Sequence, residues 1–142
     1  MANPGPSTTV EVYDQTLTTR MAKRVLFQQK ALSLSAVADT QVNILGFGTN
    51  FCITDVVVSN SSGTTINVAA GAIAVYTQPA AGGTALLAAT TLTGLTTGLL
   101  AFNATVSAPW AEVFAQPQAY LRVTTAVAGG QVDVTVFGYD LS

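Results

Sequence analysis

The residue types that most often perform catalysis are nearly absent from this sequence. Histidine, the commonest general base and the commonest metal ligand, does not occur among the 142 residues. The one cysteine, Cys52, cannot form a disulfide within the chain and has no imidazole to activate it. A Ser-His-Asp or Cys-His catalytic site is therefore excluded. Because Cys52 lies in an apolar segment, we expect a buried and chemically quiet side chain.

The carboxylates are no better candidates for catalysis. A glycosidase needs two of them about 5 to 9.5 Å apart across a sugar-binding cleft, and a calcium loop needs them at alternate positions. Here they are scattered singly, at Glu11, Asp14, Asp39, Asp55, Glu112, Asp133 and Asp140. The string GFGTNF at residues 46–51 lacks the third glycine of a dinucleotide-binding motif and predicts a turn. We therefore expect no catalytic residue, no metal and no cofactor, and a protein that is not an enzyme.

Charge is scarce and unevenly distributed along the chain. Charged residues make up 8% of the sequence, against about 25% in an average soluble domain. Such a surface suits a protein that packs against copies of itself or a larger assembly, and equally a secreted domain with a neutral polar coat. Four of the five basic residues are Arg20, Lys23, Arg24 and Lys30. They indicate either a contact with an acidic partner surface or the solvated face of an N-terminal strand or helix.

Short segments of β-type sequence, separated by turn residues, follow Ala31. The segment FCITDVVVSN is followed by a turn and a second apolar segment at residues 65–77, and a further hairpin is expected around residues 78–83. A final hairpin is expected to join residues 120–127 to 131–139, where valine alternates with other residues. Seven or eight such segments predict an all-β fold, an antiparallel β-sandwich of jelly-roll type.

The chain divides into two parts. Residues 1–30 are expected to form an N-terminal arm or extended segment, because Pro4 and Pro6 block regular hydrogen bonding. Residues 31–142 are expected to form one β-sandwich domain. No stretch of about 20 apolar residues predicts a membrane span, and the first residues lack the pattern of a signal peptide, so export is not expected. Aromatic and basic residues are not interleaved as in a nucleic-acid platform, so no nucleic-acid partner is expected.

Three segments carry a resemblance to a known class of proteins. FCITDVVVSNSSGTT, GAIAVYTQPAAGGTAL and QVDVTVFGYDLS resemble segments of the decoration, or cement, proteins that lie on the outer capsid surface of tailed bacteriophages. The resemblance implies a virion structural protein, a β-sandwich subunit that forms a homotrimer, binds the major capsid protein and bridges capsid subunits. It would reside in the host cytoplasm before assembly. The basic residues at positions 20–30 lie outside these segments.

A carbohydrate-binding or adhesive β-sandwich is the main alternative. In such a module Trp110, Tyr76, Tyr120 or Tyr139 would stack on sugar rings, and the aromatic side chains would lie exposed on one face. A shell protein would instead show an apolar interface between subunits. Trp110, between Pro109 and Glu112, also fits a loop anchor buried in the core or at an oligomer contact.

Overall fold

The computed structural model describes residues 23–44, 50–60, 66–95, 101–107, 113 and 117–141. Within these residues the chain forms eight β-strands and one turn of 3-10 helix, η1. The elements are β1 (Arg24–Ser33), β2 (Asp39–Asn43), β3 (Phe51–Asn60), β4 (Ala72–Gln78), β5 (Gly82–Thr91), η1 (Leu92–Gly94), β6 (Ala101–Ala104), β7 (Gln118–Thr125) and β8 (Gln131–Asp140). The predicted all-β fold is confirmed.

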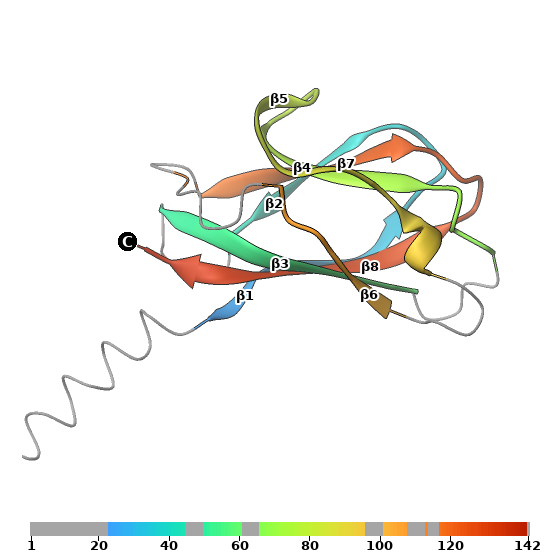
Figure 1. Cartoon of the computed structure of the whole chain (residues 1–142). Helices are drawn as coiled ribbons and strands as arrows, with labels where there is room; N and C mark the ends of the chain where they lie inside the picture. The colour runs from blue at the N-terminus through green and yellow to red at the C-terminus, as the bar shows by residue number, and fades with distance from the viewer. Residues whose placement is uncertain are drawn as a thin grey trace, which may run out of the picture.

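The strands form two antiparallel sheets that pack face to face (Figure 1). One sheet has the order β1-β8-β3-β6, and the other has the order β2-β7-β4-β5. Among the described strands, one connection between consecutive strands, from β4 to β5, stays within a sheet; the others cross from one sheet to the other. Eight strands connected in this way form a jelly roll, as the sequence predicted.

Two of the expected connections differ in their outcome. The hairpin around residues 78–83 is confirmed, because β4 pairs with β5. The prediction of a final hairpin between β7 and β8 is wrong. β7 pairs with β2 and β4, whereas β8 pairs with β1 and β3 in the other sheet. Strands that face each other across a sandwich bury one side each, just as hairpin partners do. Alternation in the sequence therefore could not distinguish the two arrangements.

Alternating apolar side chains of both sheets fill the core. Val132, Val134 and Val136 of β8 are fully buried, and so is Leu121 of β7 in the opposite sheet. Burial of each such side chain stabilises the fold by about 1.5–3 kcal/mol. Cys52 is 2% exposed, which confirms the expected burial of its side chain.

The sandwich begins earlier than the sequence indicated. β1 starts at Arg24 and pairs with β8 along its length, so residues 24–30 are extended, as expected, but belong to the sandwich and not to an arm. Register shifts near Leu26 and after Gln29 interrupt the two-residue alternation of β1, which hid this strand in the sequence. Residues 1–22, the main part of the expected arm, lie outside the described residues, as does most of the turn expected at residues 46–51.

Candidate functional site

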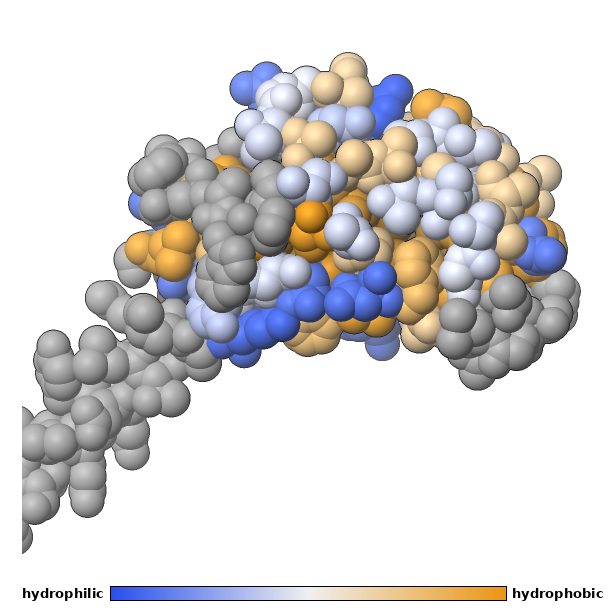
Figure 2. Space-filling model, in the orientation of Figure 1, coloured by the Kyte–Doolittle hydropathy of each residue, from blue (hydrophilic) through white to orange (hydrophobic). Residues whose placement is uncertain are grey.

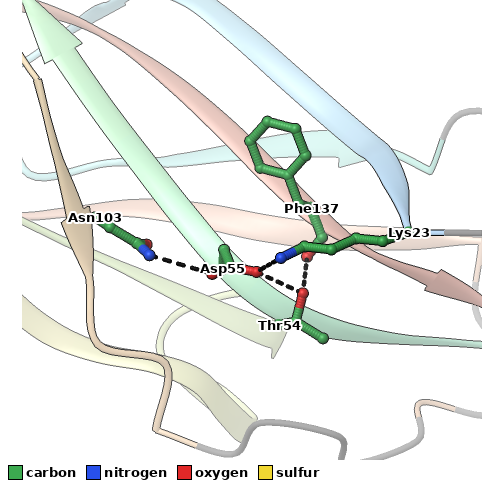
Figure 3. A network of polar contacts seen from close by, with 5 residues as sticks. All are labelled: Lys23, Thr54, Asp55, Asn103 and Phe137. Atoms are coloured by element: carbon green, nitrogen blue, oxygen red, sulfur yellow. Dashed lines mark hydrogen bonds and ion pairs between the residues drawn. The ribbon is translucent and has the colours of Figure 1, made fainter.

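A polar network lies on the outer face of the β1-β8-β3-β6 sheet, centred on Asp55 of β3 (Figure 3). The carboxylate forms an ion pair with the Lys23 ammonium group. It also accepts hydrogen bonds from Thr54 Oγ1 at 2.7 Å and from Asn103 Nδ2 at 3.1 Å. These donors, with Lys23 the most important, lower the pKa of Asp55 to about 2. At neutral pH Asp55 is therefore fully ionised, and it joins the start of β1, β3 and β6.

A β-bulge sets the position of this network. Ile53 is paired with Gly138 and Asp55 with Phe137, so Thr54 occupies the extra position in β3. From there Thr54 Oγ1 lies 3.4 Å from the carbonyl oxygen of Phe137. Gly138 permits the close approach of the two strands, because a Cβ atom at this position would overlap the carbonyl oxygen of Cys52. The absence of a side chain at Gly138 is thus a requirement of the bulge.

A second charged cluster lies on the β2-β7-β4-β5 sheet, centred on Asp39 of β2. Arg122 Nη1 on β7 is 2.9 Å from both carboxylate oxygens of Asp39. The Ala80 N–H, in the turn between β4 and β5, donates to Asp39 Oδ2 at 2.8 Å. The β4–β5 hairpin curls back over the outer face of its sheet to make this contact (Figure 1). The Ala80 hydrogen bond, followed by Arg122, holds the pKa of Asp39 below its ordinary value.

The turn that reaches Asp39 has an uncommon backbone. Gly82 N–H donates to Pro79 O at 3.0 Å, and the two central residues, Ala80 and Ala81, have φ values of 56° and 61°. Positive φ at both central positions is typical of a type I′ turn, which favours Asn-Gly. Alanine in the left-handed region costs about 1–2 kcal/mol per residue. The hydrogen bond to Asp39 helps to offset this cost.

Two of the four predicted partner-contact residues form ion pairs within the molecule. Lys23 is paired with Asp55, and Arg24 Nη2 lies 2.8 Å from Asp140 Oδ2. Lys30 is exposed on β1, and it makes no ion pair with any described residue. Arg20 lies outside the described residues. The pairing partners of Lys23 and Arg24 lie far along the chain, and sequence spacing carried no signal for them.

Positive and negative charges balance on the described part of the surface. It has four basic residues, Lys23, Arg24, Lys30 and Arg122, and four acidic residues, Asp39, Asp55, Asp133 and Asp140. Three residues of each sign are joined in ion pairs. Figure 2 shows one side of the molecule, where strongly hydrophilic residues gather toward the β1-β8-β3-β6 sheet and pale or apolar residues cover much of the rest. This surface has little charge with which to repel a neighbour.

The three described tyrosines do not share one open face. Tyr76 and Tyr120 lie opposite each other on β4 and β7, and Gln118 Nε2 donates to the Tyr120 hydroxyl at 3.0 Å. Tyr139 lies on β8 in the other sheet. All three side chains are half-buried. Trp110 lies outside the described residues. The exposed aromatic face expected of a carbohydrate-binding module is thus not formed by these tyrosines.

Among the described residues, no group of three or more Asp, Glu or Cys side chains lies together in a way that could hold a metal ion. No helix in the same part of the chain is long and apolar enough to cross a membrane. The chain matches no protein-family model, no curated protein and no solved structure.

Proposed function

We propose that this protein is a virion structural subunit that decorates the outer surface of a phage capsid and stabilises it by bridging capsid subunits. The observation that carries the proposal is a jelly roll whose described charges are balanced and mostly paired within the molecule. A surface of this kind packs against neighbouring protein with little electrostatic cost. The resemblance of β3, β4–β5 and β8 to decoration-protein segments supports the same function.

The proposed mechanism is thermodynamic. A subunit that binds the assembled shell, and not the dissociated capsid protein, raises the free energy needed to open the particle. Each copy bridges several capsid subunits, so modest contacts are multiplied by avidity. The rigid sandwich suits this task because its two sheets are joined through a continuous apolar core. No catalytic group, metal or cofactor takes part in this mechanism.

Labelling of intact particles tests the proposal directly. Phage particles are purified from infected cells that produce the protein, and mass spectrometry determines whether the chain is present in them. Gold-conjugated antibodies against the purified protein are then applied to intact and opened particles and viewed by electron microscopy. We expect labelling of the head exterior on intact particles. Particles without the chain, or particles labelled only after opening, would contradict the proposal.

The basic residues allow a sharper test of the contact. Lys30 is the basic residue of β1 that has no ion pair within the described part of the chain, whereas Arg24 is neutralised by Asp140. If an acidic capsid surface is recognised, Lys30→Gln should reduce the occupancy of stripped particles more than Arg24→Gln, and more at low salt than at high salt. Equal occupancy for both variants and the intact protein would remove β1 from the contact.

A further inference from the structure

One end of the sandwich combines exposed aliphatic side chains with an absence of charge among its described residues. It is formed by residues 34–38 between β1 and β2, residues 66–71 before β4, and residues 126–130 between β7 and β8, and we call it the three-loop end. None of these residues is charged. Val37 and Ile66 are 54% and 41% exposed, and they are two of the three large aliphatic side chains that the described surface exposes.

Hydrogen bonds join two of the three loops, and side-chain packing adds the third. Leu34 N–H donates to Gly130 O at 2.9 Å, and Val127 N–H donates to Leu34 O at 2.7 Å. The loop before β4 joins them through packing, because Ile66 Cδ1 lies against Gly129. Gly129 has a φ of 71°, a conformation that glycine adopts without cost. The three-loop end is therefore preorganised and would lose little entropy on binding.

The polar side chains of this end are largely used internally. Gly129 N–H donates to Ser35 Oγ at 3.1 Å, and Ala69 N–H donates to Asn67 Oδ1 at 2.9 Å. Removing water from this surface therefore leaves few polar groups without a hydrogen-bond partner. The described residues of the three-loop end also offer no charged group that would recognise an anion, a cation or a nucleic acid. A protein surface that is itself apolar and uncharged is the chemical match.

We propose that the three-loop end docks against the same end of other copies of this chain, around a symmetry axis. This inference rests on the proposed function, in which copies of the subunit assemble on a shell. A symmetric contact places identical residues close together, so any charge there meets its own kind at a cost of several kcal/mol. The three-loop end is free of that cost, whereas each outer sheet face carries a charged pair, Lys23–Asp55 or Arg122–Asp39.

The strand edges are poor alternatives for self-association. β1 has two register shifts and the exposed Lys30, both of which hinder pairing with another strand. β2 and β6 have five and four residues. On β5, Ser107 already occupies the edge, since its N–H donates to Leu86 O at 3.0 Å and its Oγ accepts from Ala88 N–H at 2.5 Å. Copies would therefore meet through an end and not through an edge.

Matched aspartate substitutions test the proposal. Ile66→Asp and Val37→Asp each place a like charge at the proposed axis. Leu141→Asp is the control, because Leu141 is also 41% exposed but follows β8 at the opposite end of the sandwich. We expect the intact chain and Leu141→Asp to be oligomers by light scattering, and the other two variants to show a dissociation constant raised at least about 100-fold. Far-UV circular dichroism checks that each variant folds.

Oxidative cross-linking gives a second measurement in case an aspartate variant does not fold. Val37→Cys should form disulfide-linked chains in the native oligomer, and Leu141→Cys should not, while the buried Cys52 contributes little background. A 14.5 kDa monomer for the intact chain at micromolar concentration would overturn the inference. So would an oligomer that survives both Ile66→Asp and Val37→Asp. If the Ile66→Asp variant is monomeric but antibodies still label it on the outside of intact particles, the proposed function holds independently of this contact.

Discussion

Asp55 and Asp39 occupy comparable positions on the two outer faces of the sandwich, but they are held in different ways. Asp55 is surrounded by donors from side chains, Lys23, Thr54 and Asn103, on three segments of one sheet. Asp39 receives one side-chain donor, Arg122, and one backbone donor, the Ala80 N–H of the hairpin turn. One carboxylate ties together a bulged sheet, whereas the other holds a hairpin in an unfavourable backbone conformation.

This difference separates two kinds of stabilisation. Around Asp55 the geometry depends on the close approach of β3 and β8 at Gly138, and the charged network follows from the bulge. Around Asp39 the strands pair regularly from Asp39↔Arg122 onward, and the charged group instead restrains the chain beyond them. The first site should therefore be sensitive to packing, and the second should be improved by better turn residues.

The largest effect is expected from Gly138→Ala. Its new Cβ atom would overlap the Cys52 carbonyl oxygen and lie 2.8 Å from Leu26 Cδ1. Because one of these neighbours is backbone within a sheet, we expect a loss of at least about 3 kcal/mol in the free energy of unfolding. Urea denaturation measures the change. Gly130→Ala is the control, since the side-chain atom nearest to its new Cβ atom, Val68 Cγ1, would lie 3.1 Å away and can shift. Equal losses in the two variants would show that the bulge is not the sensitive point.

A smaller effect, about 1–2 kcal/mol at neutral pH, is expected from Asp55→Asn, because the ion pair is partly exposed and screened by solvent. Its signature is the pH dependence. The folded pKa of about 2 lies below the ordinary 3.8, so the ionised group stabilises the protein above pH 4 and this contribution is lost as the pH falls toward 2. The difference in unfolding free energy between the two proteins should shrink over this range. A difference that stays constant from pH 7 to pH 2 would rule out the ion pair as its source.

The sheet with Asp39 should instead gain stability from a turn substitution. Replacing Ala80 by Asn and Ala81 by Gly supplies the residues that a type I′ turn favours. We expect the unfolding free energy to rise by about 1 kcal/mol, because the left-handed conformation costs these residues less than alanine. Ala88→Gly, in β5, is the control and should destabilise the protein. A turn variant no more stable than the intact protein would show that the positive φ angles carry no strain.

The sequence predicted the layered fold well because burial leaves a local pattern. Val132, Val134 and Val136 alternate as a half-buried strand must, and they are buried. It failed where the outcome depends on partners distant in the chain. The pairing of Lys23 with Asp55, and the separation of β7 and β8 into different sheets, arise from the crossing connections of a jelly roll. Neither feature leaves a periodic signal in any single segment.

Chemical labelling of Cys52, which lies beside the bulge in β3 and is 2% exposed, reports the local opening of this sheet and not the stability of the whole protein. A thiol reagent can reach Cys52 only when the sheet opens, and an opening free energy of about 4 kcal/mol would slow labelling about a thousand-fold relative to the denatured chain. The native protein should therefore be labelled slowly at pH 8, as measured by release of the reagent's chromophore. Gly138→Ala provides the sharper comparison, because forcing the Cys52 carbonyl away from β8 should loosen this part of the sheet and speed the reaction. Asn-Gly at positions 80 and 81 changes only the opposite sheet and should leave the labelling rate unchanged. Rapid stoichiometric labelling of the intact protein would mean that the β3–β8 pairing opens readily. The tight packing that we infer for this sheet, in contrast to the sheet with Asp39, would then be wrong.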